Sequence, residues 1–158
     1  SKDISENTMI VDLVRNDLSI TAKPASVKVE KLCGVYTFSH VHQMISTISS
    51  TLEEKNNFID VLSTTFPMGS MTGAPKIKAM QLIEKYEESK RDVYSGSVGY
   101  ITPKGDFDFN VIIRSLLYDS QKKHLSFTVG GAIVSKSEAI NEYEECLIKA
   151  KPIFQIFS

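Results

Sequence analysis

Two acidic patterns, one near each end of the chain, hold the side chains best suited to bind a metal ion. Glu142, Glu145 and Lys149 are spaced i, i+3, i+7, so on a helix they project from one face. Asp3 and Glu6 repeat the i, i+3 spacing. Four carboxylates that met would repel one another unless a divalent cation neutralised them, and an all-oxygen ligand set suits Mg²⁺. The alternative is a solvated helix face with a Glu–Lys pair that contributes about 0.2–0.5 kcal/mol.

The segment from Gly69 to Lys76 combines glycines, hydroxyl groups and the start of a predicted helix in the sequence GSMTGAPK. Backbone N–H groups at a helix N-terminus bind anions, so this segment could form an anion cradle. It lacks the glycine–lysine–hydroxyl ending of a nucleotide-binding P-loop. A plain joint between loop and helix is the alternative.

Three features on predicted strands could recognise a carboxylate. Arg114 lies in an apolar run, where a buried guanidinium would need a partner such as a carboxylate bound by two hydrogen bonds. Gly130 and Gly131 interrupt a strand, which costs stability unless something approaches the backbone closely. Tyr94 could donate its hydroxyl to the same anion. The alternatives are a solvent-facing arginine, a simple bulge and a packed aromatic ring.

The histidines and cysteines form no recognisable metal motif. His40 and His42 are spaced i, i+2 in a predicted strand, but no third ligand accompanies them, so we interpret them as surface or packing residues. Cys33 and Cys146 are far apart in the sequence. Reduced, buried thiols are the expectation, and a single disulfide is the alternative.

Hydrophobic periodicity and turn residues predict the elements that position these side chains. Helical spacing of apolar residues predicts four helices, at 4–18, 57–66, 75–88 and 138–153. Runs of β-branched and aromatic residues predict five strands, at 27–38, 40–52, 94–101, 107–118 and 125–134. Turn sequences at 103–106 and 119–122 predict hairpins between the last three strands. The predicted class is α+β, with largely antiparallel sheets and covering helices.

Composition sets a class of protein but no function. The 158 residues fit one domain or a large part of one, and the net charge of -1 favours neither nucleic acid nor a charged tail. No apolar run approaches the roughly 20 residues of a membrane-spanning helix, and residues 1–7 are too polar for a signal peptide. We therefore expect a cytoplasmic protein with no nucleic-acid and no membrane partner. Because the chain opens inside a predicted helix, we also expect a piece of a longer protein.

Six sequence motifs are distributed along essentially the whole chain. They include a VDL-x-RND helix and a GS-x-TGAPK loop, and they lie at residues 6–18, 66–76, 94–100, 107–114, 130–134 and 142–149. In these segments the chain resembles the chorismate-binding family that includes anthranilate synthase and aminodeoxychorismate synthase. The resemblance implies a large α/β sandwich with two sheets between helical layers. Residues 1–158 would be the C-terminal part of that chorismate-binding domain, and its N-terminal part would lie outside this chain.

The resemblance implies a metal site formed from both acidic patterns. Glu6 and Glu145 would bind Mg²⁺, with Asp3 and Glu142 as acidic neighbours that act partly through water. The family usually has Glu at position 3, and the side chain of Asp3 is shorter.

The resemblance also implies the substrate contacts. Tyr94 and Arg114 would hold the enolpyruvyl carboxylate of chorismate. Further contacts would come from Ser70, Gly130, Gly131 and Lys149. The catalytic candidates are Gln43, Ser70 and Lys149. Many relatives have His at position 43, and a Gln there hydrogen-bonds but is no base at neutral pH.

Within the family, Ser70, Thr72 and residues 42–47 favour the aminodeoxychorismate type. The LHPTPA-like segment of isochorismate and salicylate synthases is absent from the sequence. The expected reaction is Mg²⁺-dependent amination of chorismate by ammonia from a glutamine amidotransferase subunit. Its product, 4-amino-4-deoxychorismate, serves p-aminobenzoate and folate synthesis.

Two alternatives stay open for the function. One is anthranilate synthase component I, which serves tryptophan synthesis. The other is a non-catalytic structural fragment, because the family's PI-x-GT loop and an upstream acidic residue are not in this sequence. For the same reason we expect the isolated chain to be inactive.

Overall fold

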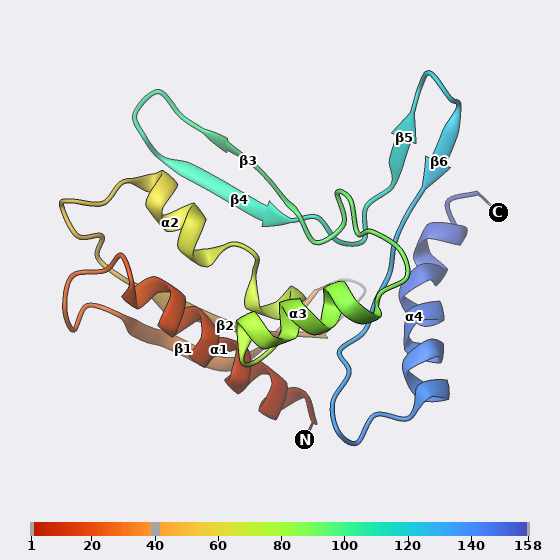
Figure 1. The fold of residues 1–158 in the computed structure, drawn as a ribbon, viewed down its shortest axis with the longest axis horizontal. Helices are drawn as coiled ribbons and strands as arrows, with labels where there is room; N and C mark the ends of the chain where they lie inside the picture. The colour runs from red at the N-terminus through yellow and green to blue at the C-terminus, as the bar shows by residue number, and fades with distance from the viewer. Residues whose placement is uncertain (1, 39–41, 158) are drawn as a thin grey trace. The chain divides into compact units, whose positions relative to one another are not determined.

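The computed structural model describes residues 2–38 and 42–157 and divides into two compact units, one ending at Ser89 and the other beginning at Lys90. Figure 1 shows helices α1, α2 and α3 with the strand pair β1–β2 in the first unit, and strands β3 to β6 with helix α4 in the second. His40 lies outside the described residues. Within those residues, no helix is both long and apolar enough to cross a membrane.

In the first unit, helix α1 packs against an antiparallel strand pair. The bounds are Lys2–Ser19 for α1, Lys28–Thr37 for β1 and His42–Ser49 for β2. The register of β1 shifts just before Gly34, where Cys33 has a φ of 52°. The Cys33 N–H donates to Ser46 Oγ at 2.8 Å, and its thiol donates to Asn7 Oδ1 at 3.4 Å. These contacts tie both strands to α1.

Two further helices of the first unit flank a loop that contains a short 3-10 turn, η1. The bounds are Phe58–Thr65 for α2, Gly69–Met71 for η1 and Lys76–Tyr86 for α3. Asn57 and Asp60 form a capping box at the start of α2, because the Asn57 side chain accepts the N–H of Ile59 and Asp60 accepts that of Asn57. Pro67 lacks the N–H needed to continue this helix.

The second unit consists of two hairpins and a helix. The bounds are Ser97–Ile101 for β3, Phe107–Val111 for β4, Leu117–Asp119 for β5, His124–Ser126 for β6 and Ala139–Phe154 for α4. Gly105 supplies a φ of 90° in the first turn, and Asp119 Oδ1 accepts the Gln121 N–H in the second. Helix α4 packs through Phe154, whose ring meets that of Phe127 edge-on at 5.5 Å between centroids.

The predicted α+β class, the four helices and both hairpin turns are confirmed. The strand predicted at 107–118 is wrong between Val111 and Leu117, because local turn bonds follow the last inter-strand bonds, which are those of Ile112. Arg114 has a φ of 50°, and Ser115 Oγ donates to the Ile113 carbonyl at 2.9 Å. Arg114 therefore lies in a bend between two strands and is exposed.

The strands predicted at 94–101 and 125–134 are shorter than expected. The first begins at Ser97, because Tyr94 belongs to a turn in which its N–H donates to the Arg91 carbonyl at 2.9 Å. The second ends at Ser126, and the backbone beyond it is irregular. There the carbonyl of Gly130 accepts a hydrogen bond from a lysine side chain in place of a strand neighbour.

Candidate active site

The second unit brings one lysine and one carboxylate of helix α4 together beside the glycine pair. Lys149 Nζ donates to the Gly130 carbonyl at 2.9 Å and forms an ion pair with Glu145 Oε1 at 2.7 Å. The i, i+4 spacing places both side chains on one face of α4, as the sequence predicts. Because one of the two partners is backbone, the ammonium is held at a fixed point on the segment that contains the glycines.

Side chains approach the glycine pair from two directions, and at Gly130 they leave no room for a Cβ. A Cβ at Gly130 would be 2.8 Å from the Tyr94 hydroxyl oxygen. A Cβ at Gly131 would be 3.4 Å from Glu142 Oε2 and 3.9 Å from Glu145 Oε1. The prediction that something approaches the backbone closely is confirmed at Gly130, whereas Gly131 has ordinary contact distances.

Glu142 is buried and is held by a residue that the sequence analysis missed. Ser137 Oγ donates to Glu142 Oε1 at 2.5 Å and accepts the N–H of Val134 at 3.0 Å. The Ser137 N–H in turn donates to the Val134 carbonyl at 2.9 Å. The hydroxyl is therefore fixed at both of its hydrogen-bonding ends. Its position just before α4 is the available signal, since serine is frequent where helices begin.

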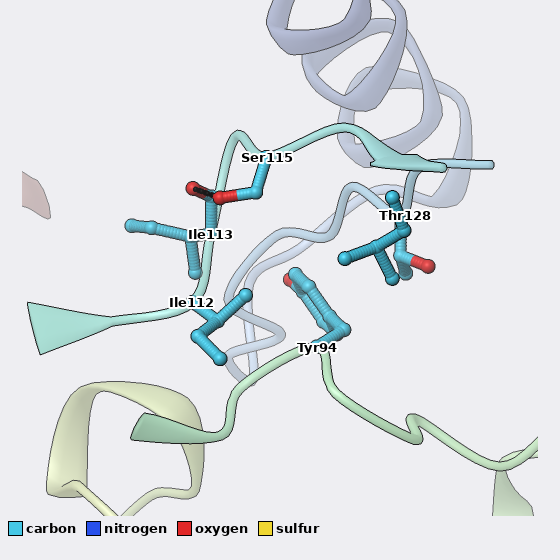
Figure 2. A pocket seen from close by; sticks show the side chains of 6 residues that line it. Tyr94, Ile112, Ile113, Ser115 and Thr128 are labelled. Carbon is cyan, nitrogen blue, oxygen red and sulfur yellow. Dashed lines mark hydrogen bonds between the residues drawn. The ribbon is translucent and has the colours of Figure 1, made fainter. Parts of the chain in front are cut away.

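A cavity of about 10 Å³ lies beside Tyr94. Figure 2 shows the Tyr94 ring among side chains that include Ile112 and Thr128. A space of this size holds about one water molecule, so it is no substrate pocket. The Tyr94 ring packs against apolar side chains, which is one of the two roles left open by the sequence, and its hydroxyl lies close to Gly130. Donation of this hydroxyl to an anion stays a prediction.

The first unit contains the remaining candidates. Ser70 is exposed within η1, and Glu6 is half-buried on α1. Thr72 Oγ1 donates back to the Met68 and Gly69 carbonyls at 3.2 and 3.3 Å, so this hydroxyl is used inside the loop. The side chain of Asp3 lies outside the described residues.

The two residues of strand β2 that the sequence singled out lie on the exposed surface. Gln43 is exposed, and its Nε2 donates to the Met44 carbonyl at 3.3 Å. His42 Nδ1 lies 3.0 Å from Thr37 Oγ1 on the exposed surface, in line with a surface histidine. The two cysteines, Cys33 and Cys146, are free thiols and half-buried, so the disulfide alternative is wrong.

The donor set of the second unit fits Mg²⁺. Among the described residues, no three His, Cys, Asp or Glu side chains gather as a metal cluster. Mg²⁺, however, is usually bound by one or two carboxylates together with water and substrate oxygens. Glu142 and Glu145 supply two carboxylates within 4 Å of one point beside Gly131. Their convergence with Asp3 and Glu6, which belong to the other unit, stays a prediction.

The chorismate binding enzyme family model matches residues 1–155, so the chain belongs to the chorismate binding enzyme family. It is 41% identical over 155 residues to an aminodeoxychorismate synthase of Streptomyces griseus, covering 98% of this chain and 21% of that protein. It is 40% identical over 154 residues to anthranilate synthase component 1 of Aquifex aeolicus, covering 98% of this chain and 31% of that protein.

A solved structure of anthranilate synthase component I from Streptococcus pneumoniae has the same fold. The TM-score is 0.81 at 37% sequence identity, over 96% of this chain and 34% of that one. The chain thus spans between 21% and 34% of the length of these three relatives.

Replacing Gly130 with Ala should destabilise the second unit by about 1–3 kcal/mol, because the new methyl group collides with the Tyr94 hydroxyl. The cost should fall in a Tyr94→Phe background, which removes that oxygen. Gly131→Ala is the matched control, since its methyl group meets its neighbours at ordinary contact distance. Urea unfolding of the four variants measures these differences. An equal cost of Gly130→Ala with and without the hydroxyl would show that crowding is not the cause.

Replacing Ser137 with Ala should destabilise the protein by about 1.5–3 kcal/mol, because a buried carboxylate loses a hydroxyl donor. Ser137→Thr keeps the hydroxyl and should retain most of the stability. Thermal and urea unfolding of both variants test this expectation. If the two variants lost the same stability, the hydroxyl would not be the group that matters.

Proposed function

We propose that this chain forms part of the active site of an enzyme that aminates chorismate with ammonia to give 4-amino-4-deoxychorismate. The proposal rests chiefly on the cluster around Gly130 and Gly131, where Lys149, Glu145 and the Tyr94 hydroxyl lie within a few ångströms of backbone that carries no side chain. A dianionic substrate that binds at this backbone needs hydrogen-bond donors and charge compensation at close range.

The donors of the second unit suit the carboxylates of chorismate. Lys149 offers a positive charge beside Gly130, and the Tyr94 hydroxyl lies on the same segment. Arg114 has the planar guanidinium that binds a carboxylate through two parallel hydrogen bonds, and its exposed position leaves the group accessible. In this proposal Tyr94 and Arg114 hold the enolpyruvyl carboxylate. Ser70, Gly130, Gly131 and Lys149 contact the rest of the substrate.

The acidic residues would bind the metal ion and not the substrate carboxylates. Glu6 and Glu145 would hold Mg²⁺ directly, and Asp3 and Glu142 would support it partly through water. Without a cation, these carboxylates would repel a dianionic substrate. When bound, Mg²⁺ supplies positive charge between the protein carboxylates and the ring carboxylate of chorismate, where it also favours departure of the ring hydroxyl.

Ammonia would come from a glutamine amidotransferase subunit, and the product would serve p-aminobenzoate and folate synthesis. In the amination a C–N bond forms at the ring carbon that carries the hydroxyl, which leaves as water. The enolpyruvyl group is retained. Of the catalytic candidates, Gln43 cannot act as a base at neutral pH, which disfavours a further elimination of pyruvate.

Anthranilate formation is the second candidate. It is favoured by the 40% identity to the Aquifex aeolicus anthranilate synthase and by the 0.81 TM-score of the Streptococcus pneumoniae structure. Against it we weigh the Ser70 and Thr72 hydroxyls of the loop, which resemble the aminodeoxychorismate type, and the Gln at position 43.

Incubating the full-length gene product with chorismate, Mg²⁺ and ammonium chloride should yield 4-amino-4-deoxychorismate without release of pyruvate. The product should become p-aminobenzoate only after a separate lyase is added. Chromatography with a coupled pyruvate assay separates the outcomes. Formation of fluorescent anthranilate with an equal amount of pyruvate would contradict the proposed reaction and support the second candidate, anthranilate formation.

Replacing Glu145 with Gln should raise the Mg²⁺ concentration that gives half-maximal activity by at least about 10-fold, because a carboxylate ligand is lost. Titration calorimetry with Mg²⁺ should show the same weakening without any turnover. Glu144→Gln is the matched control, since Glu144 is the exposed neighbour on the same helix. Equal Mg²⁺ affinity in the two variants would remove Glu145 from the metal site.

A further inference from the structure

A buried ion pair joins two motifs of the first unit. Lys76 Nζ lies 2.5 Å from Asp17 Oδ2, and the two side chains are only 14% and 8% exposed. Lys76 also reaches the Thr65 carbonyl at 3.5 Å. Asp17 belongs to the VDL-x-RND segment of α1, and Lys76 ends the GS-x-TGAPK loop and begins α3. The ammonium is thus held by α1 and is not directed at an anion in the loop.

Each charge of this pair lies at the helix end that disfavours it. Asp17 lies in the last turn of α1, near the negative end of the helix dipole. Lys76 lies in the first turn of α3, near the positive end, and no acidic residue accompanies it there. Buried ion pairs are often no more stabilising than apolar residues of the same volume. Stability alone therefore gives a weak reason for this pair.

The pair lies on the face of α1 that meets the loop. Glu6, Leu13 and Asp17 share that face, because spacings of 7 and 11 residues are close to whole helical turns. Leu13 packs against Gly69, where an added Cβ would lie 3.1 Å from the leucine side chain. The face with the expected Mg²⁺ ligand is thus held on the loop that contains Ser70 by one apolar contact and one ion pair.

We propose that Asp17 and Lys76 are positioning residues that fix α1 against the loop of residues 67–75. The apolar contact of Leu13 resists separation of the two segments but allows sliding. The ion pair, with its single short contact, fixes the axial position and rotation of α1. It thereby sets the distance between Glu6 and Ser70, which lie on the two joined segments. The roles of Glu6 and Ser70 rest on the function proposed above.

The test is a variant that removes both charges. Asp17→Asn or Lys76→Met alone leaves one buried charge without its counter-ion, so each should destabilise the fold. The double variant Asp17→Asn/Lys76→Met leaves none and should unfold at a temperature closer to wild type than either single variant does. In the full-length gene product, the double variant should raise KM for chorismate by about 10–100-fold, as expected when a supporting contact of a site is lost.

Lys23→Met is the matched control. It removes the same charge from an ion pair of the same unit, with Glu54 at 3.1 Å, but that pair is 45% and 90% exposed. It should leave KM unchanged. Should the double variant fail to fold, Asp17→Glu takes its place, because it keeps the pair but lengthens it by one methylene. The same rise in KM is expected.

A double variant with the wild-type KM would overturn the proposal, since the pair would then have no part in placing the site. If the wild-type protein does not consume chorismate at all, the proposed function fails, but the positioning role is still decided by amide hydrogen exchange without substrate. Exchange of residues 67–75 should be faster in the double variant than in Lys23→Met. Equal exchange in the two would overturn the positioning role.

Discussion

The candidate site depends on the absence of a side chain at Gly130, the first of two consecutive glycines, Gly130 and Gly131. The Tyr94 hydroxyl closes on the first, and carboxylates of α4 close on the second. Lys149 then binds the carbonyl of Gly130, which a regular strand would have used for its own ladder. The phenol and the ammonium can both approach this residue because nothing projects from Gly130, and the two carboxylates lie at ordinary contact distance from Gly131.

Charge is the second constraint, and it explains why basic and acidic groups are mixed. The dianionic substrate proposed above and the carboxylates of Glu142 and Glu145 would repel each other unless cations separated them. Glu145 already has a cationic neighbour in Lys149, and Glu142 is held by the Ser137 hydroxyl. Each carboxylate therefore has a built-in partner, which lowers the cost of keeping acidic groups together before a metal ion or substrate arrives.

The sequence was sufficient to predict the elements that depend on local residue patterns. It was insufficient to predict those that depend on backbone conformation or on contacts with other segments. Helix α4 followed from apolar periodicity, and the turn at Asp119 followed from the turn residues at 119–122, where the Asp119 side chain accepts the Gln121 N–H. The strand predicted through Arg114 failed because apolar composition cannot report a left-handed backbone. The spacing of Glu145 and Lys149 predicted their shared face, but the role of Ser137 required knowing where the preceding backbone turns.

The ion pair between Asp17 and Lys76 has a consequence for how this sequence can diverge. Replacing either residue alone by an uncharged one leaves a buried charge, at a cost of about 3–5 kcal/mol, which is a large share of the stability of an ordinary domain. Both must change for the loss to become tolerable. A lineage can therefore abandon the pair only through a poorly folded intermediate, so the two positions, 59 residues apart in the chain, are bound to evolve as one.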